Sequence, residues 1–236
     1  MLTLAIDRPG ALNAIDRATF TDLTAALTDA MRHAAVRVVV LRGSGDNFSV
    51  GADIKEEISA PAELHALAQA PHPVALLYVY PKPTLAGICG YCLGGALEIA
   101  LGFDLRLAAD NAQFGFAEID WALTPGWGGA ALLQRIVGRA TALDLLLTGR
   151  RVGAAEALRL GLVSEVCPAV EFEIRLATLA ARLAEAPPQT VSGIKRLLAD
   201  RDLAGDLERE LALFAEIAHD PEAQRRINAF RSGKRL

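Results

Sequence analysis

The chain has few residues that could cross-link it through disulfides or metals. It has three cysteines in 236 residues, too few for a disulfide framework, and its four histidines show no spacing typical of zinc ligands. A chain of this length buries about 70 to 75% of its unfolded surface, so a hydrophobic core can support the fold without staples. We therefore predict one globular domain and no metal site.

Long apolar runs are also absent. The run at 74–80 is bracketed by Pro73 and Pro81 and is far shorter than the roughly 18 residues of a membrane helix. Asp7 and Arg8 come before any apolar signal segment can form. Lys and Arg number 24 against 28 Asp and Glu, and this net charge of -4 argues against nucleic acid as the main ligand. We predict a cytoplasmic protein that binds neither membrane nor nucleic acid.

The hydrophobic period changes once along the chain. Up to about residue 115, short apolar runs alternate with helical segments, which predicts parallel strands joined by right-handed crossovers. The predicted strands are 2–6, 36–41, 84–88 and 105–109, and the predicted helices are 16–33, a segment just before Pro81, and 94–101.

After Gly128 the chain becomes almost wholly helical. An apolar stripe at helical spacing follows residue 169, formed by Leu176, Leu179, Ala180 and Leu183. We therefore predict an α/β core at 1–168 followed by a helical region at 169–236.

The segment 87–104, GICGYCLGGALEIALGFD, carries the strongest chemical signal. Glu98 is the single charge in a short helix that is otherwise apolar all round, and a buried carboxylate needs a partner or a function. Gly94 and Gly95 leave backbone N–H groups at the positive end of this helix, suited to an anion or an oxyanion. Two alternatives stay open. In the first, Glu98 lies on a solvent-facing strip of the helix. In the second, the two glycines serve only to let the helix pack closely against a strand.

Two further segments carry similar features. In FSVGADIKE at 48–56, Gly51 permits a tight bend after a strand, although an ordinary turn with Asp53 as helix cap explains the same residues. In FGFAEIDWALTPGWGG at 114–129, Glu118 stands among apolar neighbours. Only the fold can bring Glu118 close to Glu98.

These motifs, together with DRPGALNAI at 7–15 and TGRRVGAAEALRLGLVSEV at 148–166, are similar in order and spacing to the enoyl-CoA hydratase/isomerase (crotonase) superfamily. The resemblance implies a crotonase-like α/β spiral of ββα units with a helical C-terminal trimerisation region. It also implies a homo-trimer or hexamer, an acyl-CoA substrate, and no cofactor beyond the CoA moiety of that substrate.

The resemblance also implies roles for residues. The N–H groups of Ala52 and Gly95 would form an oxyanion hole, and Glu98 and Glu118 would flank the substrate. The implied reaction is hydration of an α,β-unsaturated acyl-CoA thioester to the 3-hydroxyacyl-CoA. Glu98 would activate water and Glu118 would protonate C2, with the reverse sharing of protons left open.

Substrate and CoA contacts are likewise implied by the resemblance, at Ala11, Leu12, Val50, Ala52, Asp53, Ile54, Lys55, Gly95, Trp127, Phe230 and Lys234. Trp127 stands where the family usually has a small residue, which predicts a pocket that is short or shaped for a flat acyl group. The alternative places the indole in the core or an interface. Phe230 and Lys234 would reach the nucleotide of a neighbouring subunit, whereas the tail arginines are equally typical of a solvated helix face.

Several other functions remain open at this point. Isomerases of the family usually keep only the glutamate at the Glu118 position, so the presence of Glu98 favours hydration. Decarboxylases, thioester hydrolases and a noncatalytic or RNA-binding scaffold of the same fold are alternatives. Cys89 and Cys92 form C-x-x-C between a strand and a helix, a place where thiols can be activated for redox work.

Overall fold

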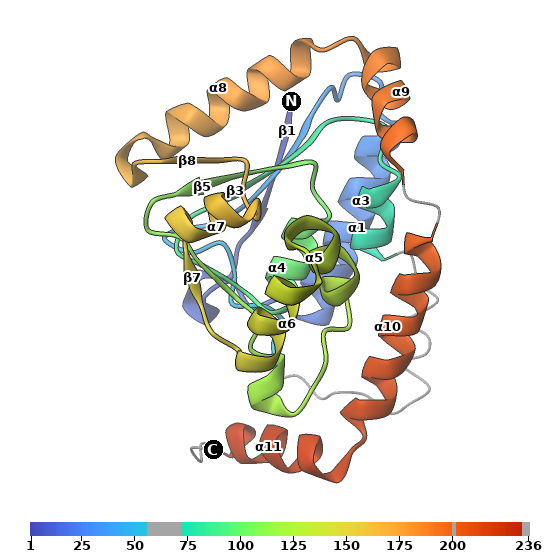
Figure 1. Ribbon diagram of the computed structural model, residues 1–236. Coiled ribbons are helices and arrows are strands. Elements are labelled where there is room, and N and C mark those ends of the chain that lie inside the picture. Colours follow the sequence, from blue (N-terminus) through green and yellow to red (C-terminus); the bar gives the residue numbers. More distant parts are fainter. Residues whose placement is uncertain (56–71, 200–201, 233–236) are drawn as a thin grey trace.

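The main sheet is parallel, as the sequence predicts. The computed structural model describes residues 1–55, 72–199 and 202–232 (Figure 1). Five strands lie in the order β1-β2-β3-β5-β8, and every neighbouring pair in the sheet is parallel. Their bounds are Leu2–Ile6 for β1, Val39–Gly43 for β2, Thr84–Ile88 for β3, Leu105–Ala109 for β5 and Glu165–Cys167 for β8.

The second strand begins later than the predicted 36–41. The Val36 N–H donates to the His33 carbonyl at 3.0 Å, so Val36 belongs to the turn that closes the preceding helix. Pairing with β1 then starts at Val39, opposite Leu2. The apolar run is therefore shared between a turn and a strand, and periodicity alone did not separate them.

A second, smaller sheet contains β4 (Tyr91–Leu93), β6 (Gln113–Gly115) and β7 (Val152–Gly153). The chain passes from β3 to β4 at Gly90, which has a φ of +55° and lies so close to Asp46 that a Cβ would be 2.2 Å from its carbonyl oxygen. Helix α4 (Gly95–Leu101) follows β4. Strand β3 of the main sheet, β4 of the second sheet and helix α4 together form the predicted ββα unit.

Helices α1, α3 and α4 form close to the ranges that the apolar pattern predicts. Helix α1 (Arg17–Arg32) is capped by Asp16, whose carboxylate accepts from the Thr19 N–H at 2.8 Å. Helix α3 (Pro73–Tyr78) contacts both α1 and α4. The next helices are α5 (Gly129–Val137), α6 (Arg139–Thr148) and α7 (Ala154–Leu160), and the short 3-10 turns are η1 (Pro9–Ala11), η2 (Glu118–Trp121) and η3 (Ala169–Glu171).

The helical region after β8 contains α8 (Phe172–Glu185), α9 (Pro188–Leu198), α10 (Leu203–Ala218) and α11 (Pro221–Arg231). Figure 1 shows α8 beside β8 and β5, with α10 and α11 on the far side of the core. The stripe of α8 packs on Val40, Leu85 and Leu107 of its own sheet. The stripe is therefore used at least in part within its own chain, and the implied trimerisation role of this region stays a prediction. No helix among the described residues is long and apolar enough to cross a membrane.

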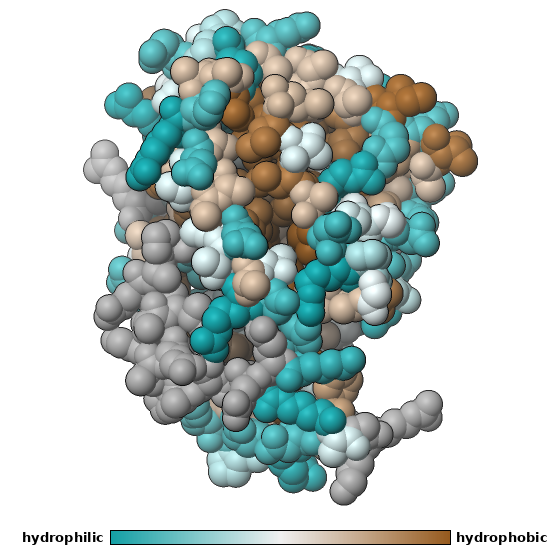
Figure 2. Space-filling model, turned by 180° about the vertical axis from the view of Figure 1, so that it is seen from behind, coloured by the Kyte–Doolittle hydropathy of each residue, from teal (hydrophilic) through white to brown (hydrophobic). Residues whose placement is uncertain are grey.

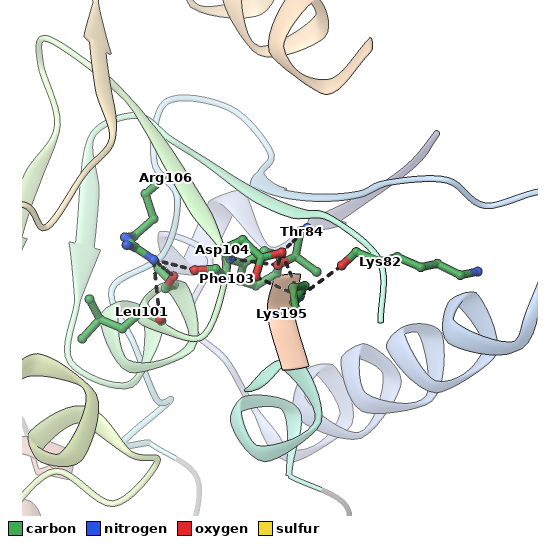
Figure 3. Close-up of polar contacts among 8 residues, drawn as sticks. Lys82, Thr84, Leu101, Phe103, Asp104, Arg106 and Lys195 are labelled. Carbon is green, nitrogen blue, oxygen red and sulfur yellow. Dashed lines mark hydrogen bonds and ion pairs between the residues drawn. The ribbon is translucent and has the colours of Figure 1, made fainter. Parts of the chain in front are cut away.

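Helix α9 is held to the sheet by polar contacts rather than by buried apolar side chains (Figure 3). The Lys195 ammonium lies 2.8 Å from the Asp104 carboxylate and donates to the Lys82 carbonyl at 3.1 Å. Asp104 also accepts from the Thr84 N–H at 2.8 Å. One carboxylate thus fixes both the start of β3 and a helix far along the chain.

On the face of the molecule that is hidden in Figure 1, apolar side chains surround a hollow (Figure 2). A groove between β1 and α1 is lined by apolar residues such as Leu4 and Leu23 and by charged residues such as Arg8 and Asp22. β1 is the outer strand of the main sheet on this side. This groove is separate from the cavity described next, which is lined by other residues.

Candidate active site

A cavity of about 580 Å³ brings together the three glycine-containing or acidic segments singled out from the sequence. All of the predicted site residues that the structure describes line it: Ala11, Leu12, Val50, Ala52, Asp53, Ile54, Lys55, Gly95, Glu98, Glu118, Trp127 and Phe230. Lys234 lies outside the described residues. The walls are mostly apolar, with a few polar groups, as in typical small-molecule sites.

Two residues that line this cavity, Ala52 and Gly95, have backbone N–H groups outside the regular hydrogen-bond pattern. The Ile15 N–H donates to the Gly51 carbonyl at 2.8 Å, and the Asp53 N–H donates to the Ile15 carbonyl at 2.9 Å. This parallel bridge uses the residues on either side of Ala52, so the Ala52 N–H points away from Ile15. Gly95 is the first residue of α4, where N–H groups have no helical partner. Across the described ranges, we find no acceptor for either N–H.

Gly51 allows these two segments to meet. It has a φ of +95°, and a Cβ at this position would lie 2.6 Å from the Leu93 carbonyl oxygen and 3.2 Å from the Gly95 nitrogen. Any larger residue would push the Ala52 loop away from α4. The alternative of an ordinary turn does not explain this close approach, although the Asp53 carboxylate does accept from the Lys55 N–H at 3.2 Å.

Glu98 is buried, which excludes the alternative of a solvent-facing strip: the residue is only 2% exposed. Its Oε2 accepts from the Trp127 and Gly129 N–H groups, both at 2.7 Å, and its Oε1 accepts from the Gly126 N–H at 3.4 Å. Burial and the nearby carboxyls of Glu118 and Glu210 raise the pKa of Glu98 well above its usual value, and these backbone hydrogen bonds oppose that rise.

Glu118 opens the short turn η2 and lies against the start of α4. Its Oε1 is 2.9 Å from the position of a Cβ on Gly94, so Gly94 leaves the space that this carboxyl occupies. Its Oε2 is buried and has no hydrogen-bond partner. Burial raises the pKa of Glu118 to about 7, and the charge of Glu210 adds to the rise. Glu118 therefore changes protonation near neutral pH.

Trp127 covers Gly95 inside the cavity. A Cβ on Gly95 would be 2.5 Å from the indole ring, so the two residues are in direct contact. The ring also packs against Phe20, with 4.8 Å between ring centres, and approaches His72 at 6.4 Å. The indole lines the cavity beside the N–H of Gly95 rather than lying wholly in the core.

His72 is a lining residue that sequence analysis did not single out. Its Nδ1 accepts from the Val74 N–H at 3.2 Å at the start of α3, and burial lowers its pKa to about 4. The ring is therefore neutral at pH 7 and carries its hydrogen on Nε2, which has no partner. The sequence offered one signal for this residue: it stands directly before Pro73, the first residue of α3.

Helices α10 and α11 also contribute to the cavity of their own chain. Leu211 and Phe214 of α10 line it, and Phe230 of α11 packs edge-on against Trp121 with 4.9 Å between ring centres. Phe230 thus lines the cavity of its own chain, and its contact with the nucleotide of a neighbouring subunit stays a prediction. Arg225 forms an exposed ion pair with Glu222, as a solvated helix face predicts.

The C-x-x-C pair lacks the features of a redox site. Cys92 is fully buried and Cys89 partly so, and burial raises the pKa of both thiols. A raised pKa disfavours the thiolate, which is the reactive form. In the described part of the chain, no group of three or more His, Cys, Asp or Glu side chains is arranged to hold a metal ion.

Comparisons with known proteins identify the family of the chain. The family model for enoyl-CoA hydratase/isomerase matches residues 1–234. A probable enoyl-CoA hydratase of Bacillus subtilis is 35% identical over 96% of this chain and 90% of its own length. A probable enoyl-CoA hydratase of Mycobacterium tuberculosis is 40% identical over 70% of this chain, and that match spans 65% of its own length.

Among solved structures, an enoyl-CoA hydratase from Mycobacterium avium subsp. paratuberculosis superposes with a TM-score of 0.86. It is 31% identical, and the match covers 96% of this chain and 93% of that one. The crotonase-like fold implied by the sequence is thereby confirmed. The chain belongs to the enoyl-CoA hydratase/isomerase family.

Proposed function

We propose that this protein hydrates an α,β-unsaturated acyl-CoA thioester to the 3-hydroxyacyl-CoA. The observation that carries the proposal is the presence of two buried carboxyls, Glu98 and Glu118, in the same cavity as the N–H groups of Ala52 and Gly95. The N–H groups are suited to bind the thioester oxygen and to stabilise the enolate charge that develops when water attacks C3. The carboxyls are suited to move the protons that hydration requires.

The proton transfers balance if the glutamate pair holds one proton. The ionised member takes a proton from water as the water oxygen bonds to C3, and the protonated member gives its proton to C2. The number of protons on the pair is then unchanged. We propose Glu98 as the carboxylate, because its Oε2 accepts from two backbone N–H groups at 2.7 Å, and Glu118, whose pKa burial raises to about 7, as the acid that protonates C2.

Turnover of defined thioesters tests the proposal. The protein is incubated with crotonyl-CoA and with longer and ring-containing enoyl-CoA thioesters, and loss of the enone absorbance is followed. We expect hydration of at least one of them, with the 3-hydroxyacyl-CoA as product. Double-bond migration, loss of CO₂ or release of free CoA in place of hydration would identify an isomerase, a decarboxylase or a hydrolase instead.

Replacing Trp127 by Ala is expected to change which acyl chain is preferred. The indole occupies space beside Gly95 that a longer acyl group needs. The variant should therefore accept longer enoyl-CoA substrates and lose efficiency on the preferred short or flat one, because the vacated volume removes contacts. The measurement is kcat/KM across the thioester panel.

Trp121→Ala provides the matched control, since this indole also lines the cavity but packs on Phe230 rather than on Gly95. An unchanged ratio of kcat/KM for short and long substrates in Trp127→Ala, accompanied only by a lower Tm, would show that Trp127 stabilises the fold without limiting the acyl group.

We also propose that the chain forms a homo-oligomer, a trimer or a pair of trimers. Because the stripe of α8 is used within the chain, support comes from apolar side chains that remain exposed on the helical region. Val170 is 91% exposed and Leu197 is 86% exposed. Burial of such residues between subunits is favourable at about 25 cal/mol per Å². Sedimentation as an active monomer at micromolar concentration would contradict this proposal.

A further inference from the structure

Helix α10 lies directly on the turn that holds Glu98. Leu207, Glu210 and Phe214 fall on one face of the helix, three and seven residues apart. A Cβ on Gly128 would be 2.5 Å from a Leu207 methyl, and a Cβ on Gly126 would be 2.6 Å from the Phe214 ring. Glu210 is therefore placed between two close contacts, facing the same turn.

The Glu210 carboxylate binds backbone N–H groups of that turn. It accepts from the Gly128 N–H at 2.9 Å and from the Ala131 N–H at 2.8 Å, at the start of α5. Glu98 accepts from the neighbouring Trp127 and Gly129 N–H groups. Two carboxyls from different helices thus bind alternate peptide groups of one turn, and neither can shift without disturbing the other.

The two carboxyls also lie close enough for the charge of Glu210 to raise the pKa of Glu98. A negative charge on Glu210 therefore disfavours ionisation of Glu98. The other charged groups around them are Glu118 on η2 and, one turn earlier on α10, Asp206, which is paired with Arg135 of α5. Glu210 does not line the cavity, so it acts on the substrate only through Glu98.

We propose that Glu210 is a positioning residue of the active site, holding the Glu98 carboxyl in place through the turn 126–131. The inference rests on the proposed hydration, in which Glu98 transfers a proton. Helix α10 then contributes a residue that positions Glu98, in addition to the side chains with which it lines the cavity.

The test compares Glu210→Gln with Glu208→Gln, the same change at an exposed position of the same helix. Removing the negative charge beside Glu98 favours ionisation of Glu98. For Glu210→Gln we expect kcat to fall about 10-fold with KM within about threefold of wild type, and the pH profile of kcat to shift by about one unit to lower pH. Glu208→Gln should match the wild type in all three.

A readout without substrate separates this inference from the proposed function. Protein labelled with ¹³C at glutamate carboxyls is titrated by NMR, and the Glu98 resonance is assigned from its loss in Glu98→Gln. We expect Glu98 to titrate at lower pH in Glu210→Gln. If this shift occurs but no thioester is hydrated, the proposed function fails and the link between Glu98 and Glu210 stands. An unchanged titration together with wild-type kcat would overturn the inference.

If Glu210→Gln does not fold, as judged by circular dichroism, Glu210→Asp takes its place. Asp keeps the charge but is one methylene shorter, so it cannot reach both N–H groups. We then expect a lower kcat with an unchanged KM. A kcat within twofold of wild type in this variant would also overturn the inference.

Discussion

Replacing Glu118 by Gln is expected to lower the rate of hydration by roughly 10² to 10⁴, the usual contribution of a positioned acid or base. Glutamine has almost the same shape, so the space left by Gly94 stays filled and the acyl-CoA substrate should bind with a similar KM. Steady-state kinetics on the preferred thioester measure both quantities. Asp120→Asn, in the same short turn but exposed, is the matched control and should retain activity.

Glu98→Gln should produce a loss of the same size, because hydration needs both members of the pair. An active Glu98→Gln variant would instead indicate isomerase or decarboxylase chemistry, in which one glutamate suffices. A double variant should lose little more than either single variant, since groups that act as a unit are not additive.

The pH dependence of stability gives Glu118 a second signature. Its pKa is raised from 4.5 to about 7 in the folded protein, so folding favours the protonated carboxyl. The free energy of unfolding should therefore be highest below pH 4.5 as far as this group is concerned, and should fall as the pH rises through 7. Glu118→Gln removes this loss, so the variant should have a higher Tm than wild type above pH 7. Equal Tm values at pH 8 would show that burying the ionised Glu118 carboxyl does not lower the stability of the protein.

Local pattern predicted much of the fold. The strands at 2–6, 84–88 and 105–109 have the predicted bounds, because each is a short apolar run bordered by turn residues or a polar residue. Spacing alone could not show that Glu98 and Glu118 meet, since they belong to different ββα units. The resemblance to the family supplied that expectation, and the structure places both carboxyls in one cavity.

Glu210 was missed although its pattern resembled that of Glu98. It is an acid on the apolar face between Leu207 and Phe214, but the exposed Glu208 and Glu216 on the same helix make it look like part of a charged surface. Its role depends on where α10 lies relative to the turn before α5, which is set by contacts distant in sequence. The burial of the α8 stripe within its own chain was missed for the same reason.

Replacing Gly51 by Ala is expected to lower kcat by roughly 10² to 10³, as loss of one oxyanion donor does. Crowding by the new methyl group should move the Ala52 N–H away from the Gly95 N–H, so that one thioester oxygen can no longer reach both. Gly45→Ala separates this effect from backbone strain: Gly45 also has a positive φ, of +70°, but its nearest neighbour would be 3.9 Å away. Each variant should lose about 1 to 2 kcal/mol of stability from its positive-φ backbone, measured by urea unfolding, and Gly51→Ala should lose more because of the crowding. Only Gly51→Ala should lose activity while it still binds a saturated acyl-CoA, and equal activity in the two variants would rule out the two N–H groups as the oxyanion hole.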